Sequence, residues 1–136
     1  MKHGRLSGKV ALVTGGNRGI GKGIARATVG EGPRALCVLP RAGRVYVSSY
    51  YAGKSEALVA RSLKPVAAIP ASVGVHTMVA TPDESKIYVM ETSSDKLYVI
   101  DTASNTVRKV LEDGLGTGQW DMEITPNGKT VVISNW

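Results

Sequence analysis

The sequence of 136 residues contains no phenylalanine, and aromatic residues make up only 5% of it. Tyrosine, valine and isoleucine must therefore fill much of the core, which favours β-structure. No apolar run approaches the roughly 18 residues that a membrane-spanning helix needs, so we expect no membrane partner. The single cysteine, Cys37, excludes an internal disulfide and a multi-cysteine metal site. We expect it to be a small buried apolar residue, and we predict no metal site.

Acidic residues are nearly absent from the start of the chain. The first 44 residues hold nine lysines and arginines against Glu31 alone, whereas the remainder holds 8 basic and 10 acidic residues. This asymmetry indicates two segments of different origin, or a basic head that faces an anion. The head has no aromatic residue on which a base could stack, so nucleic acid is not the expected partner. Its apolar run, residues 10–13, is too short for a signal peptide, which predicts a cytoplasmic location.

A glycine-rich turn follows the β-rich run at residues 9–13. Ile20, Ile24 and Ala25 then recur at helical spacing, so the pattern predicts a strand, a turn and a helix in that order. Glycine allows the sharp turn and the close approach of backbone to a pyrophosphate. The unpaired N–H groups at the start of the helix would face that phosphate. The opening is therefore typical of a phosphate-binding turn.

Residues 14–21 resemble the TGxxxGxG fingerprint of the short-chain dehydrogenase/reductase family, and the resemblance extends over residues 6–27. It implies a Rossmann-like βα segment at residues 1–30 with an NAD(P) pyrophosphate site. The residues that would bind the cofactor are Thr14, Gly15, Asn17, Arg18, Gly19, Ile20 and Gly21. Arg18 resembles a feature of members that prefer NADP, which is the alternative cofactor. Because one βα unit lacks the flanking parallel sheet, we expect no resident cofactor.

The rest of the chain carries an internal repeat. Pro40, Pro82 and Pro126 are 42 and 44 residues apart, and a glycine precedes each at positions 32, 74 and 118. The middle unit predicts four strands, at residues 76–80, 87–90, 97–100 and 106–110. Four short strands in about 42 residues are typical of a β-propeller blade. The segments resemble YVTN-type propeller repeats, which implies a partial propeller at residues 31–136 with blades at 31–72, 73–115 and an incomplete 116–136.

The predicted fold is therefore mainly β, with about two and a half four-stranded β-propeller blades preceded by a short βα Rossmann-like unit. A closed propeller needs at least four blades, and the last blade here stops after its second strand. We expect self-association through the open blade edges, or else a recombined or truncated product without an evolved activity. Trp120 and Trp136 are expected to pack between blades.

Two functional hypotheses follow from these resemblances. The first is a non-enzymatic β-propeller fragment that acts as an interaction or assembly module, with no catalytic residue. The alternative is an NAD(P)-binding oxidoreductase similar to the short-chain dehydrogenases, with Tyr50, Lys54 and Ser48 or Ser49 as its catalytic group. Gly53 and the strand-forming residues before it favour a hairpin over the helix that this group needs. Arg41 would hold the 2′-phosphate of NADP in one hypothesis and lie in a blade turn in the other.

Overall fold

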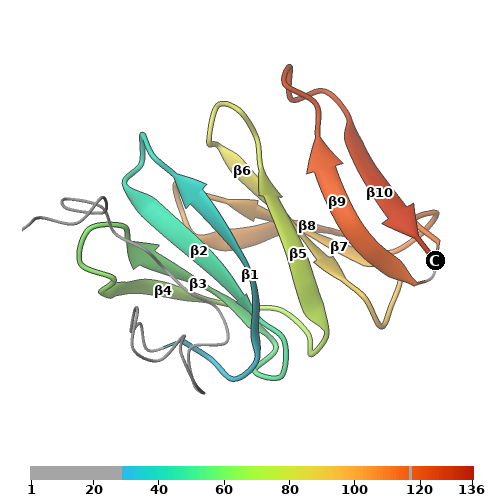
Figure 1. The fold of residues 1–136 in the computed structure, drawn as a ribbon, viewed down its shortest axis with the longest axis horizontal. Helices are drawn as coiled ribbons and strands as arrows, with labels where there is room; N and C mark the ends of the chain where they lie inside the picture. The colour runs from blue at the N-terminus through green and yellow to red at the C-terminus, as the bar shows by residue number, and fades with distance from the viewer. Residues whose placement is uncertain (1–28, 117) are drawn as a thin grey trace, which may run out of the picture.

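The computed structural model describes residues 29–116 and 118–136, and these residues form three antiparallel β-sheets (Figure 1). The first sheet contains β1 (Pro33–Leu39), β2 (Arg44–Ser49), β3 (Lys54–Val59) and β4 (Pro65–Pro70). The second contains β5 (Val75–Ala80), β6 (Lys86–Glu91), β7 (Lys96–Asp101) and β8 (Thr106–Leu111). The third contains β9 (Gln119–Ile124) and β10 (Val131–Asn135). Each sheet is a meander in which consecutive strands are neighbours.

Short polar turns join the strands because their side chains bond to the local backbone. In the turn between β5 and β6, the Thr81 N–H donates to the Lys86 carbonyl at 2.9 Å, and the Asp83 carboxylate accepts the Thr81 hydroxyl. The turn between β9 and β10 repeats this arrangement with Thr125 and Asn127. Asp and Asn favour such turns because their short side chains can replace a backbone acceptor. The turn residues thus close the hairpins.

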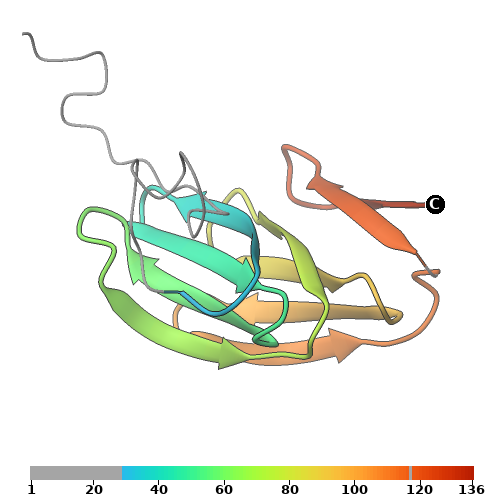
Figure 2. The ribbon, with the colours of Figure 1, turned by 60° about the horizontal axis from the view of Figure 1, so that its bottom comes forward.

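The three sheets are arranged in a row. Strands β1, β5 and β9, the first of each sheet, lie side by side (Figure 1). The last strands of the two larger sheets, β4 and β8, also lie next to each other (Figure 2). The sheets therefore stack in chain order, and the second sheet is covered on both faces.

Apolar side chains fill the two spaces between the sheets. The core between the first and second sheets contains Leu39, Tyr46, Ala57, Ile69, Val75, Met78, Ile87, Val89, Tyr98 and Ile100. Between the second and third sheets, Met90 and Leu97 pack with Met122. A third cluster lies on the other face of the first sheet, where Val29 packs on Val45 and Val47. Full burial of each such side chain contributes about 1.5–3 kcal/mol, so these spaces supply most of the stability.

A glycine carbonyl marks the entry to each sheet. The N–H groups of Tyr50, Thr92 and Trp136 donate to the carbonyls of Gly32, Gly74 and Gly118 at 2.8, 3.1 and 3.2 Å. All three glycines have a positive φ, which L-residues rarely adopt. The spacing of 42 and 44 residues found in the sequence therefore corresponds to a repeated backbone contact.

The fold class predicted from the sequence, with a βα Rossmann-like unit ahead of the blades, is wrong. The fold is all-β, since the described residues contain no helix and form antiparallel sheets of four, four and two strands. A Rossmann unit requires a parallel strand followed by a helix. Most of the segment assigned to that unit, residues 1–28, lies outside the described residues, and Val29 and Gly30 have no regular structure. The helix was inferred from local spacing and from the family resemblance of residues 6–27.

The four strands expected in the middle repeat are confirmed as β5–β8, each within two residues of its expected ends. The domain limits at residues 30 and 31 stay a prediction.

No helix of a length and hydrophobicity suited to crossing a bilayer occurs in residues 29–116 and 118–136.

We expect Gly74→Ala to destabilise the protein by about 3 kcal/mol, because it combines backbone strain with overpacking. Gly74 has a φ of +108°, and an added Cβ would collide with the Ser93 hydroxyl and approach Glu91 Cγ to 3.1 Å. Gly43→Ala is the matched control, since Gly43 has a φ of +62° and no atom within 4 Å of the added Cβ. Strain alone predicts a loss of about 1 kcal/mol there. Urea unfolding of both variants measures the difference, and equal losses would refute the packing argument.

Candidate functional site

The residues predicted to bind a nucleotide, from Thr14 to Gly21, lie outside the described residues. Their role therefore stays a prediction.

The Tyr50 and Lys54 pair lies in a hairpin. Residues 50–53 form the turn between β2 and β3, and Lys54 is the first residue of β3. The Lys54 ammonium pairs with Glu56 at 2.9 Å, whereas the Tyr50 ring contacts the Arg34 guanidinium and the Tyr51 ring. A tyrosine base of the dehydrogenase kind needs its lysine on the same helical face, where the charge lowers the phenol pKa. The hairpin does not supply that arrangement, and the predicted hairpin is confirmed.

Arg41 follows β1 and contacts the next sheet. Its guanidinium lies 3.5 Å from the Glu84 carboxylate, which also accepts the backbone N–H groups of Arg41 and Ala42 at 3.1 and 2.9 Å. Burial raises the pKa of Glu84, but these N–H donors and the Arg41 charge outweigh it and leave the pKa below its usual value. Arg41 therefore links two sheets. The sequence did not indicate Glu84 as its partner, because the two residues are 43 apart.

Cys37 lies on β1 and is half-buried. Burial raises the pKa of its thiol to about 11, so the thiol stays protonated at neutral pH. A thiol of this kind is a poor nucleophile. It packs against the core between the first two sheets, as expected for an apolar residue.

A buried carboxylate, Glu56, ties the entry segment to the first sheet. Its oxygens accept the Gly30 N–H at 2.8 and 3.0 Å and the Ser49 hydroxyl at 2.7 Å, and they pair with Lys54. Burial raises the pKa of Glu56, but the Gly30, Lys54 and Ser49 bonds outweigh it, so the pKa lies below its usual value.

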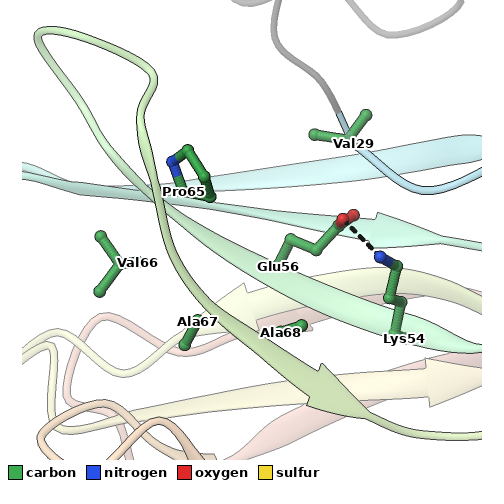
Figure 3. Close-up of a pocket in the computed structure, with 7 residues that line it drawn as sticks. All are labelled: Val29, Lys54, Glu56, Pro65, Val66, Ala67 and Ala68. Carbon is green, nitrogen blue, oxygen red and sulfur yellow. Dashed lines mark ion pairs between the residues drawn. The ribbon is translucent and has the colours of Figure 1, made fainter.

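Beside Glu56 lies a cavity of about 410 Å³, lined by Val29, Lys54 and four residues of β4 (Figure 3). The close-up shows the Glu56 and Lys54 side chains turned toward each other. The carboxylate is satisfied by protein donors, so the cavity offers a ligand a mainly apolar wall beside the Lys54 ammonium.

The second sheet holds a carboxylate at a related place but supplies it from a different strand. Glu91, on β6, accepts hydrogen bonds from the hydroxyls of Ser72, Ser93 and Tyr98. By the 42-residue repeat, Ser72 corresponds to Gly30, Glu91 to Ser49 and Tyr98 to Glu56. The acid and its hydroxyl partner have therefore exchanged strands between the repeats. Neither residue type nor spacing alone revealed this polar cluster.

The two tryptophans are exposed, contrary to the expectation that they pack between blades. Trp136 is 91% exposed and Trp120 is 60% exposed. Trp120 nevertheless contacts the second sheet, because its ring lies 5.4 Å from the His76 ring at an angle of 36°. The Thr77 hydroxyl also donates to the Trp120 carbonyl at 3.2 Å.

Apolar side chains are exposed at both ends of the row of sheets. At one end, Leu36 and Val38 of β1 are 36% and 53% exposed, and they alternate with Cys37 and Leu39, which face the second sheet. At the other end, Val132 of β10 is 58% exposed and alternates with Val131 and Ile133, which face the second sheet. The two ends thus each expose apolar side chains that point away from the second sheet, although Val45 and Val47 beside Leu36 and Val38 are buried and Glu123 lies across from Val132.

The free edge of β10 lacks the features that protect the other two outer edges. Prolines stand at both ends of β4, at positions 65 and 70, and remove backbone donors. On β8, Arg108 and Lys109 place exposed charge in the middle of the strand. Charge and proline on an edge strand prevent pairing with other chains, and residues 131–135 contain neither. The edge of β10 thus differs in composition from the edges of β4 and β8.

We expect Glu56→Gln to lower the free energy of unfolding at pH 7 by about 2 kcal/mol, through weakened charge-assisted hydrogen bonds. The pKa of Glu56 is lower in the folded state, so its contribution is present above the unfolded pKa of about 4.3 and is lost as pH falls through the folded pKa. The gap between the wild type and this variant should therefore shrink below about pH 4.3. Glu112→Gln, which removes an exposed carboxylate 3.5 Å from Lys96, is the control and should cost under about 1 kcal/mol. Denaturant unfolding at pH 7 and pH 2.5 checks both, and a constant gap would contradict the assignment.

No protein-family model matches the chain, and no curated protein matches it. Among solved structures, hydrazine synthase of Kuenenia stuttgartiensis is similar, with a TM-score of 0.71 and 21% sequence identity. The likeness covers 92% of this chain and 33% of that one, so this chain spans about a third of the length of its structural neighbour. At this identity the likeness concerns the fold alone. The chain thus shares an all-β fold with a part of that protein.

Proposed function

We propose that residues 33–135 are part of a β-propeller and that the chain acts as a non-enzymatic assembly module. Copies would join head to tail, with the third sheet of one copy packed on the first sheet of the next. The single observation that carries the proposal is the exposure of apolar side chains at both ends of the row of sheets, Leu36 and Val38 at one end and Val132 at the other.

The repeat supports a propeller-like continuation. Three successive sheets are entered through equivalent glycines, and their first strands lie side by side. Propellers arrange four-stranded sheets around a central channel in this manner. Each repeat buries its faces mainly against its neighbours, so the two ends of a row of sheets keep apolar side chains exposed, here Leu36 and Val38 at one end and Val132 at the other.

The end faces match the contacts already made inside the row. β5 contacts β1 on one side and β9 on the other. In the next step of the same series, β9 of one copy would contact β1 of another, which brings Val132 toward Leu36 and Val38. Such a contact is heterologous, and it closes a ring when the rotation per copy allows it.

The edge of β10 supports the third sheet as the site of contact. Just before β10 the Thr130 carbonyl accepts the Thr125 N–H, and just after it the Trp136 N–H donates to the Gly118 carbonyl. The backbone groups of the even-numbered residues of β10 therefore point toward β9. Since bonding direction alternates along an antiparallel strand, the backbone groups of Val131, Ile133 and Asn135 face outward. An uncharged strand with free donors and acceptors readily accepts another strand.

We expect Val132→Lys and Val38→Lys each to abolish self-association, because each places a charge in one end face. Light scattering over a range of concentrations should give the wild type a mass above 14.3 kDa that rises with concentration, and each variant the single-chain mass. Val73→Lys is the matched control, since Val73 is also 58% exposed but lies between β4 and β5, and this variant should behave like the wild type.

Mixing the two variants separates head-to-tail joining from other contacts. Val132→Lys keeps an intact first sheet, and Val38→Lys keeps an intact third sheet, so an equimolar mixture should form a dimer that neither variant forms alone. A wild type at the single-chain mass throughout would overturn the proposal. So would a mixture that stays monomeric while the variants remain folded by circular dichroism.

A further inference from the structure

A β-bulge occurs at the same position of the first strand in every sheet. In the first sheet Pro33 pairs with Ser49 and Ala35 with Ser48, which leaves Arg34 as the extra residue. The register of β5 shifts between Val75 and Met78, and that of β9 shifts between Gln119 and Asp121. A bulge inserts one residue into a strand and turns its side chain away from the regular alternation.

The side chains at these bulges are Arg34, His76 and Trp120, again 42 and 44 residues apart. Because β1, β5 and β9 lie side by side (Figure 1), the three bulge positions follow one another across the first strands, and we name these residues the bulge row. The His76 and Trp120 rings are 5.4 Å apart, and the Arg34 guanidinium lies 5.1 Å from the centre of the Tyr50 ring. All three members of the row have a planar side-chain group, and Trp120 and Arg34 are exposed.

Arg34 is held in place but keeps its donors. Its guanidinium lies over the Tyr50 ring, which is an attractive cation–π contact. Within residues 29–116 and 118–136, no acidic side chain forms an ion pair with it and no acceptor bonds to it. The planar fork of arginine matches carboxylate and phosphate oxygens, so the Arg34 guanidinium suits an anion.

The other end of the row provides a stacking surface. One face of the Trp120 ring meets His76, and the ring is 60% exposed. The two ring centres are 5.4 Å apart, which leaves no room for a third ring between them. A ligand ring would therefore contact both rings from the solvent side. Aromatic rings in offset or edge contact stabilise each other by about 0.5–1.5 kcal/mol.

We propose that the bulge row binds a planar aromatic ring joined to an anionic group, with the ring on Trp120 and His76 and the anion on Arg34. The anion is a carboxylate or a phosphate, since both suit the guanidinium. The site lies within one chain and does not rest on self-association.

Local charge favours an anion at the Arg34 end. Burial lowers the pKa of His76, the Arg34 charge lowers it further, and the Asp121 carboxylate raises it in part, so the net shift is downward. His76 is therefore a neutral ring at pH 7, suited to stacking. Its Nδ1 lies 3.0 Å from the Thr77 hydroxyl, which fixes the orientation of the ring. Asp121 lies at the Trp120 end, away from the anion.

The test is a titration with naphthalene-2-carboxylate at pH 7.5, in which binding is measured by calorimetry and by tryptophan fluorescence. We expect saturable binding with a dissociation constant on the order of 0.1–1 mM, as suits a small ligand on an open site. Cyclohexanecarboxylate, which lacks the planar ring, and naphthalene-2-methanol, which lacks the charge, should each bind at least about tenfold more weakly. Adenosine monophosphate and inorganic phosphate form the phosphate arm. Tighter binding of the nucleotide than of naphthalene-2-carboxylate would assign the anion as a phosphate.

Two variants with matched controls locate the site. Arg34→Gln and Trp120→Leu should each weaken binding by about tenfold, because each removes one of the two contacts. Arg61→Gln, an exposed arginine in the turn between β3 and β4, and Trp136→Leu, the other tryptophan, should leave binding unchanged. Absence of saturable binding to the wild type, or binding that survives both Arg34→Gln and Trp120→Leu, would overturn the proposal. Repeating the titration on Val132→Lys keeps the result independent of whether the chain self-associates.

Discussion

The burial of both faces of the second sheet is the constraint on which the rest of the structure depends. Ile87 and Val89 of β6 face the first sheet, while Met90 of the same strand and Leu97 of β7 face the third. A sheet with two apolar faces is stable only when both are covered, which fixes the order of the three sheets. On the outer faces of the first and third sheets, by contrast, Leu36, Val38 and Val132 remain exposed.

Polar contacts then set how the sheets are joined. Glu84 receives two backbone N–H groups and a guanidinium from the turn after β1, and thereby links the first sheet to the second. Glu56 and Glu91 tie the incoming chain to the second and third strands of each larger sheet, although they stand on different strands. A buried carboxylate is tolerated there because hydroxyl and N–H donors surround it. The repeat therefore preserves an interaction while its residues vary.

The bulges of β1, β5 and β9 determine which side chains lie on the surface of the first strands. Regular strands would alternate their side chains strictly, but the extra residue in β1, β5 and β9 redirects Arg34, His76 and Trp120. Because the first strands are neighbours, the three bulge positions follow one another across them. An arginine without an acidic partner among the described residues and an exposed indole, 86 residues apart in the chain, thus stand on strands that flank the same neighbour, β5.

The sequence by itself determined the β-strands of the repeats, their polar turns and the spacing of 42 and 44 residues, because alternation and turn chemistry act over a few residues. The same local logic predicted a βα unit in the fold, which the all-β structure corrects, and it offered Tyr50 and Lys54 as a catalytic pair, which a hairpin holds in a different arrangement. Only the tertiary structure decided that Arg41 contacts Glu84, that the tryptophans are exposed, and that the bulged residues form one row. These contacts join residues far apart in the chain, so they depend on how the sheets pack, which no short stretch of sequence encodes.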